Sequence, residues 1–147
     1  NTADRSIALL DVALRRRFIF IEMMPRLDLL EEAFISSQEI ELDLSELLGK
    51  LNKFISNEID RNHQIGHSYF LKVADANPED RLAILNFVWN YQIFPLLMEY
   101  FYSQNDKLLS FLNPFIDGSQ DVSFEDMLKE DEDLLTALYT ICKSEEI

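Results

Sequence analysis

Apolar residues recur at three- and four-residue spacing along most of the chain, which is the period of an amphipathic helix. The clearest stripe predicts a helix over about residues 45–60, with Asp43 or Ser45 as its N-cap. Its apolar positions are Leu47, Leu48, Leu51, Phe54, Ile55 and Ile59. A shorter stripe predicts another helix after Pro25, with Leu27, Leu30, Ala33 and Phe34 on its apolar face.

The longest helical pattern follows a loop. Residues 61–77 contain Gly66 and keep no sustained period, so they predict a loop with a short ordered turn at 68–70. Asn77-Pro78-Glu79 then places a proline directly after an N-cap, which predicts a helix start. The apolar positions of this helix are Leu82, Leu85, Trp89, Ile93, Leu96, Leu97, Tyr100 and Phe101. Pro95 lies inside it and has no N–H to donate, which predicts a kink or a break.

Two further helices are predicted, over residues 108–115, where Pro114 ends the pattern, and over residues 123–142. The acidic run at 130–133 in the second pattern can interrupt the helix or form a solvated face; docking of a basic partner is the alternative. Trp89 lies in the middle of an apolar stripe and is predicted to be a core residue.

The first 25 residues follow a different pattern. A short helix through about Arg16, capped by Asp4 or Ser6, precedes residues 18–21, four apolar β-prone residues in a row that are typical of a strand buried on both faces. Such a strand needs partner strands, which the downstream sequence barely offers. We therefore expect the partner strands to precede Asn1 in a longer protein. The predicted fold class is mainly α.

Composition narrows the function classes. The 147 residues are 48% hydrophobic and contain only three glycines, enough apolar material for about one domain core. The net charge of −14 disfavours DNA binding by this chain, because phosphate contacts need clustered Lys and Arg. Cys142 is the single cysteine and, without a nearby histidine, is not predicted to be a nucleophile. No apolar run approaches the roughly 18 residues of a membrane span, so we expect no membrane partner and a cytoplasmic location.

Charge changes sign near Pro25. Residues 1–26 hold five arginines and three acidic residues, a net charge of +2, and the rest of the chain carries −16. A basic edge beside an acidic body suits an anionic ligand at their junction. Arg15, Arg16 and Arg17 are consecutive there; they would stabilise a helix C-terminus, and their planar guanidinium groups also suit phosphate.

Three stretches together resemble a known family. The first 20 residues contain Asn1-Thr2-Ala3-Asp4-Arg5-Ser6 and then Ala13-Leu14-Arg15-Arg16-Arg17-Phe18. The other two are Arg61-Asn62-His63-Gln64-Ile65-Gly66-His67-Ser68-Tyr69-Phe70 and Ile93-Phe94-Pro95-Leu96-Leu97-Met98-Glu99-Tyr100-Phe101-Tyr102. They resemble the second half of an AAA+ NTPase module of the McrB family, the motor subunit of methylcytosine-specific restriction systems.

The resemblance implies a division of the chain. Residues 1–25 would be the last helix and strand of an AAA+ core, residues 26–104 a helical lid, and residues 105–147 a C-terminal helical extension. Asn1 resembles the sensor-1 residue that positions the attacking water, and Arg16 and Arg17 resemble arginine fingers that reach a neighbouring subunit's nucleotide.

The same resemblance implies nucleotide contacts from Asp4 and from the sensor-2 region of the lid, Gly66, His67 and Ser68, where His67 is the cationic candidate. It also implies ATP or GTP with Mg²⁺ in the full-length protein, neighbouring subunits of a homo-oligomeric ring, a nuclease partner subunit, and DNA contacts from other parts of the parent. The chain has no Gly-Lys-Ser or Gly-Lys-Thr phosphate loop, so we expect it to bind and hydrolyse no nucleotide alone.

Two other interpretations remain at this point. His63 and His67 are four residues apart like a zinc-binding pair, but Gln64 stands where a general-base glutamate would be and Gly66 weakens a helix, so no metal site is predicted. The alternative function, from a different class, is a non-enzymatic acidic helical domain that docks a protein partner.

Overall fold

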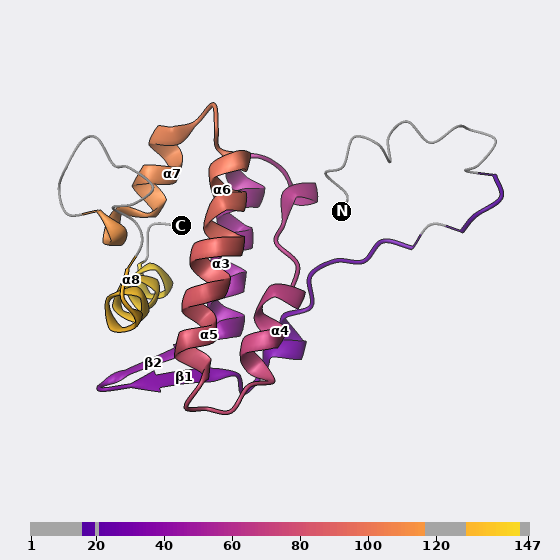
Figure 1. The fold of residues 1–147 in the computed structure, drawn as a ribbon. Helices are drawn as coiled ribbons and strands as arrows, with labels where there is room; N and C mark the ends of the chain where they lie inside the picture. The colour runs from indigo at the N-terminus through magenta and orange to yellow at the C-terminus, as the bar shows by residue number, and fades with distance from the viewer. Residues whose placement is uncertain (1–15, 20, 117–128, 145–147) are drawn as a thin grey trace.

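A computed structural model describes residues 16–19, 21–116 and 129–144, which form a mainly helical body with one β-hairpin (Figure 1). The elements are η1 (Leu27–Leu30), β1 (Phe34–Ser37), β2 (Ile40–Asp43), α3 (Leu44–Glu58), η2 (Arg61–His63), α4 (Ser68–Ala74), α5 (Arg81–Val88), η3 (Trp89–Ile93), α6 (Phe94–Tyr100), α7 (Asn105–Phe111), η4 (Asn113–Phe115) and α8 (Asp131–Lys143). Figure 1 shows α5 and α6 as one rod beside α3, with α4 on one side, α7 and α8 on the other, and the hairpin at one end. The predicted mainly α fold is confirmed.

Helix α3 begins and ends close to its predicted positions. Of the two candidate caps, the structure selects Asp43, whose carboxylate accepts hydrogen bonds from the backbone N–H groups of Ser45 at 2.8 Å and Glu46 at 3.4 Å. These bonds satisfy two of the donors that a helix start leaves free.

The predicted helix after Pro25 is wrong. Only the short 3₁₀ turn η1 forms there, and the chain then enters an antiparallel hairpin in which Ile35 pairs with Leu42. Both of these side chains are buried, so one face of the hairpin packs on the core. Glu32 and Gln38 have left-handed backbone angles, with φ of 64° and 52°. Glu32 lies between η1 and β1, where the helical turn ends, and Gln38 lies in the turn between the two strands. Neither residue is a glycine, so the sequence carried no turn signal.

The long helical pattern that contains Pro95 is interrupted near the proline, as predicted, by a turn of π-helix. Helix α5 passes into the π-helical turn η3, in which the Phe94 N–H bonds to the Trp89 carbonyl five residues back, and α6 then starts with Pro95 in its first turn. The predicted helix start at Asn77 is wrong, because residues 77–80 form a separate turn closed by an N–H···O bond from Asp80 to Asn77 at 2.9 Å.

Three other predicted boundaries shift. The predicted loop over 61–77 contains the turn η2 and the helix α4, in which Phe70 and Val73 are buried. Helix α7 starts before residue 108, and Pro114 lies in the following 3₁₀ turn. In the described part of the predicted helix over 123–142, α8 begins in the acidic run, where carboxylates are favourable in a first helical turn. Residues 117–128 lie outside the described residues.

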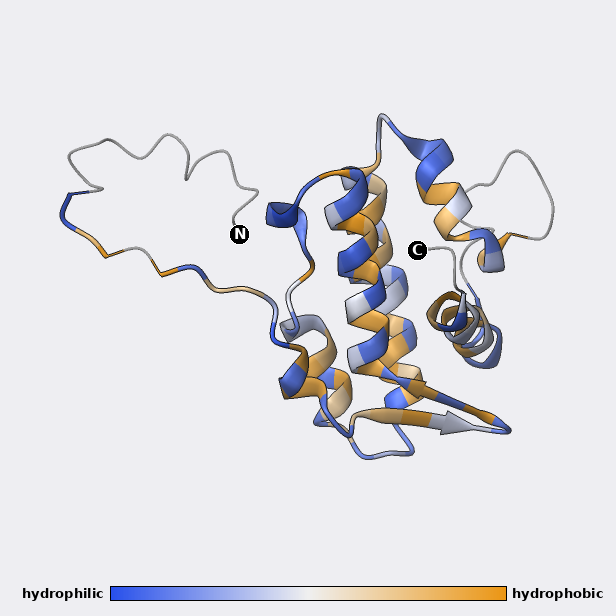
Figure 2. Cartoon of the chain, turned by 180° about the vertical axis from the view of Figure 1, so that it is seen from behind, coloured by the Kyte–Doolittle hydropathy of each residue, from blue (hydrophilic) through white to orange (hydrophobic). Residues whose placement is uncertain are grey.

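Aromatic stacking forms the centre of the core. The Phe54 ring of α3 stacks on Phe101 at 4.8 Å and on Phe111 at 4.2 Å between centroids. Trp89 is buried, as predicted, and stacks on Phe115 at 5.5 Å. Figure 2 shows hydrophobic and hydrophilic residues in turn along the helices, as amphipathic packing requires.

The described residues of the predicted strand over 18–21, which are 18, 19 and 21, form no strand. Phe18 and Ile19 belong to no strand and are 63% and 91% exposed. A strand requires a neighbour to bond its backbone groups, and within the described residues the two strands of the hairpin pair with each other. The helix predicted before Arg16 lies outside the described residues, as do Asn1 and Asp4.

Candidate functional site

The loop that contains Gly66, His67 and Ser68 is fastened to α3 by one side chain. The Asn52 amide donates from Nδ2 to the Ile65 carbonyl at 2.9 Å, and its Oδ1 accepts from the Ile65 N–H at 2.6 Å. Asn52 is 7% exposed and Ile65 is 1% exposed. This two-bond clamp fixes the backbone immediately before the three candidate residues.

Asn52 was missed in the sequence analysis. It lies on the same face of α3 as Leu48, Leu51 and Ile55, all of which are buried. An amide on an apolar helix stripe must find hydrogen-bond partners when it is buried, and this was the signal that could have identified it.

His67 joins the loop to residues 21–26, which are called the connector here and lie between the Arg16–Arg17 pair and η1. Its imidazole Nδ1 accepts a hydrogen bond from the Arg26 backbone N–H at 3.1 Å. An Nδ1 that accepts is unprotonated, so the neutral ring carries its proton on Nε2. The His67 carbonyl accepts from the N–H groups of Phe70 and Leu71, which starts helix α4.

Two more polar contacts hold the same connector. The Arg61 guanidinium donates to Glu22 Oε1 at 2.6 Å on the surface. Arg26 pairs with Asp28, and this hydrogen bond lowers the pKa of the Asp28 carboxyl and raises the pKa of Arg26. The connector thus contacts the helical body at Arg61 and at His67.

His63 and His67 do not form a metal pair. The His63 Nδ1 lies 2.9 Å from Asp60 Oδ1, and its ring meets Tyr100 edge-on at 5.0 Å. Hydrogen bonding to His63 lowers the pKa of Asp60, while burial raises the pKa of Tyr100. Across the part of the chain that the structure describes, no group of three His, Cys, Asp or Glu side chains could hold a metal ion.

The structure brings some of the predicted residues together and leaves others apart. Gly66 and His67 directly precede α4, and Ser68 is its first residue; a Cβ added at Gly66 would meet only Ser68 Oγ, at 3.7 Å, so packing does not require the glycine. Arg16 and Arg17 are exposed. The candidate residues of the lid and the arginines are therefore linked through the connector and form no closed site within the described residues.

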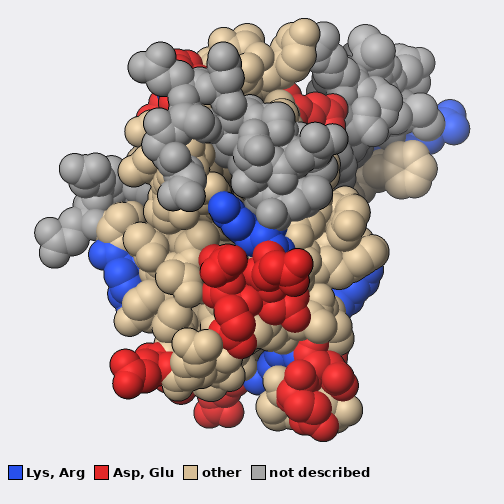
Figure 3. All heavy atoms as spheres, turned by 60° about the vertical axis from the view of Figure 1, so that its left-hand side comes forward, with Lys and Arg blue, Asp and Glu red and all other residues tan. Residues whose placement is uncertain are grey.

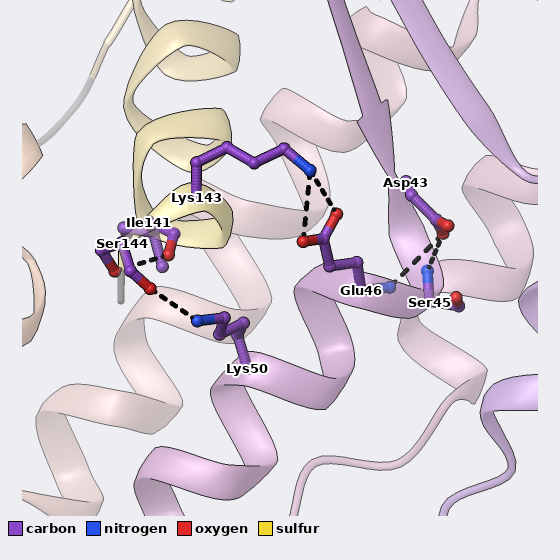
Figure 4. A network of polar contacts seen from close by, with 7 residues as sticks. All are labelled: Asp43, Ser45, Glu46, Lys50, Ile141, Lys143 and Ser144. Carbon is purple, nitrogen blue, oxygen red and sulfur yellow. Dashed lines mark hydrogen bonds and ion pairs between the residues drawn. The ribbon is translucent and has the colours of Figure 1, made fainter. Parts of the chain in front are cut away.

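The acidic start of α8 and the end of this helix are tied into the fold. Ser37 Oγ donates to Glu132 at 2.6 Å, and Lys143 bonds to Glu46 at 2.9 Å. Figure 4 shows this second contact beside a bond from Lys50 to the Ser144 carbonyl at 2.7 Å, so α8 is held along α3. Figure 3 shows acidic side chains gathered in groups on this side of the molecule.

Cys142 lies in the interior behind these contacts. Its side chain is buried, and burial raises the pKa of the thiol to about 12. A thiol with that pKa stays protonated near neutral pH and is a poor nucleophile, as the sequence predicted.

An open pocket of about 570 Å³ lies where α3, α7, η4 and α8 meet. Phe54, Phe111 and Ile141 supply apolar walls, while Glu58 and Lys107 form an ion pair of 2.6 Å at the pocket. None of the predicted site residues lines it.

Comparison with known proteins identifies the family of part of this helical body. The profile of the family described as "McrB, alpha-helical lid domain" matches residues 43–109. Residues 43–109 of the chain therefore belong to the McrB α-helical lid family, which confirms the resemblance seen in the motifs.

One curated relative extends over more of the chain. The "Type IV methyl-directed restriction enzyme EcoKMcrB subunit" of Escherichia coli (strain K12) is 35% identical to it over 127 residues. This match covers 81% of the chain and 28% of the relative, so the chain spans under a third of that protein's length. None of the helices in the described ranges is long and apolar enough to cross a membrane.

Proposed function

We propose that the chain is the lid-bearing part of an AAA+ NTPase in a modification-dependent restriction system. In this proposal the lid closes over ATP or GTP, and hydrolysis in a homo-oligomeric ring drives translocation and DNA cleavage by a nuclease partner subunit. The single observation that carries the proposal is the lid-family match over residues 43–109. The 35% identity to a restriction-enzyme subunit supports the choice of system.

The nucleotide would approach the lid at the loop that Asn52 anchors. A Cβ at Gly66 would meet only Ser68 Oγ, at 3.7 Å. The His67 ring uses Nδ1 to accept from Arg26, and its Nε2–H, free of any bond to the described residues, can donate to a phosphate oxygen. Ser68 is exposed at the start of α4. Asp4 and the sensor-1 residue Asn1 complete the proposed nucleotide contacts from the core side.

Magnesium and the triphosphate would be held mainly by other parts of the full-length protein. The phosphate loop that grips a nucleotide is missing from this sequence, and the described residues contain no cluster of metal ligands. The proposed contribution of the chain is therefore closure by the lid and charge neutralisation by its arginines.

Arg16 and Arg17 would act as fingers in the site of a neighbouring subunit. Both are exposed in a net basic segment, as a residue acting in trans must be. Guanidinium groups neutralise the charge that develops on the transferred phosphoryl group, and a finger is worth roughly 10³-fold or more in turnover.

The test is substitution of each arginine in the full-length protein. Arg16→Ala or Arg17→Ala should lower turnover by about 10³-fold while nucleotide affinity changes far less. Arg26→Ala is the matched control, because that side chain makes only a surface pair with Asp28, and its turnover should stay within a few-fold. Turnover within a few-fold of wild type in both finger variants would refute the assignment.

Mixed rings separate a finger from a residue that acts in its own site. A subunit without Arg16 and Arg17 should still provide a working nucleotide pocket when its neighbour supplies intact arginines. If mixing this variant with a subunit that keeps its arginines but has an inactivated nucleotide pocket restores no turnover, the arginines act in cis.

A further inference from the structure

Two polar side chains of the lid hold the segment that carries Arg16 and Arg17: Arg61, whose guanidinium contacts Glu22 and Met24, and His67. The Arg61–Glu22 pair joins two side chains that are 60% and 58% exposed, and water and salt weaken such pairs. The bond from the Arg26 N–H to His67 Nδ1 at 3.1 Å fixes the backbone itself and depends on a single acceptor atom. The bond to His67 is therefore the contact that sets the position of the Arg26 backbone.

His67 also belongs to a continuous chain of contacts through the lid. Asn52 holds Ile65 to α3, Ile65 lies two residues before His67, and His67 holds Arg26. A rigid movement of α3 would thus carry the backbone at Arg26 with it. Arg17 is nine residues from Arg26, which limits its reach from that point to roughly 30 Å.

From this geometry we infer that His67 is a positioning residue that couples lid movement to the arginine-bearing segment. Its Nδ1 fixes where that segment leaves the lid. The same hydrogen bond keeps the ring proton on Nε2. The inference deepens the proposed function and rests on it for the role of Arg16 and Arg17, but the contact itself can be tested without any nucleotide.

Side-chain isosteres can isolate the acceptor atom. In His67→Asn the amide oxygen can occupy the place of Nδ1 and accept from the Arg26 N–H. In His67→Gln the amide group lies one carbon further out, near the place of Nε2, and the acceptor is lost. Asn and Gln are both neutral amides, so the pair differs mainly in where the polar atoms lie.

The first readout is hydrogen exchange at the Arg26 amide in the 147-residue chain, measured by NMR. Relative to a core amide of α3 such as Leu51, exchange at Arg26 should accelerate about fivefold in His67→Gln, the effect of losing one hydrogen bond. In His67→Asn it should stay near the wild-type rate. Arg61→Gln is the control for the surface pair and should leave the Arg26 rate unchanged.

The second readout is steady-state turnover of the full-length protein. His67→Gln should lower kcat about fivefold or more with a smaller change in KM, whereas His67→Asn should keep kcat near the wild-type value and raise KM, because it retains the acceptor for Arg26 but lacks the Nε2–H proposed to contact the nucleotide. Equal Arg26 exchange in the Asn and Gln variants would overturn the contact. A rise in KM with kcat unchanged in His67→Gln would overturn the positioning role and leave His67 as a nucleotide contact.

These outcomes are separable from failure of the proposed function. If Arg16→Ala and Arg17→Ala keep full turnover, the finger assignment fails, whereas the exchange result at Arg26 still decides whether His67 holds the connector. If the arginine variants lose turnover and both His67 variants keep it, the proposed function survives and the coupling is wrong.

Discussion

Asn52→Ala removes the side chain that fastens the candidate loop to α3. The substitution leaves the Ile65 N–H and carbonyl, bonded at 2.6 and 2.9 Å in the structure, without their partners. Ile65 is almost completely buried, so water reaches these two groups only through the space that the shortened side chain vacates.

The magnitude follows from the two lost bonds. A buried backbone group without a partner costs about 1–3 kcal/mol, which gives roughly 2–6 kcal/mol for the pair. Water entering the vacated space recovers part of this cost, and alanine is the better helix former by about 0.5 kcal/mol. We expect the free energy of unfolding to fall by about 3 kcal/mol.

Urea denaturation followed by Trp89 fluorescence measures this change, because Trp89 is the single tryptophan and is buried against Phe115. Asn57→Ala is the matched control: it makes the same substitution in the same helix at an exposed position. It carries the same gain in helix propensity, so the difference between the two variants reports the clamp alone. A difference below about 1 kcal/mol would refute the reasoning.

Two further predictions concern the core. Phe70→Ala should lower the free energy of unfolding by about 3–5 kcal/mol, because Phe70 is fully buried, whereas Phe87→Ala at a 56% exposed site should cost far less in the same urea titration. Equal losses in the two variants would contradict the assignment of Phe70 to the core. The Cys142 thiol has its pKa raised by burial from 9.0 to about 12, so the unfolded chain releases this proton first and the stability from this group falls as pH rises above 9. Wild type should lose about 2 kcal/mol more than Cys142→Ala between pH 8 and 10.5 in pH-dependent unfolding; parallel curves would count against this.

The sequence determined the features that depend on neighbours a few residues away. Helix periodicity predicted the apolar stripe of α3, and the missing N–H of Pro95 predicted an irregularity in its helix. The sequence narrowed the N-cap of α3 to Asp43 or Ser45, whose side-chain oxygens can accept from the first N–H groups of a helix. The motifs near Arg61 and Ile93 were also sufficient to indicate the McrB family, because they are contiguous strings.

Tertiary structure decided the contacts between residues far apart in the sequence. The hairpin turns at Gln38, a non-glycine residue with positive φ, and its register is set by burial of Ile35 and Leu42 against the helices. Asn52 meets Ile65 across 13 positions, and His67 meets Arg26 across 41. No local rule links such pairs, since each polar group takes the partner that packing brings near and the cost of leaving it unpaired enforces the choice.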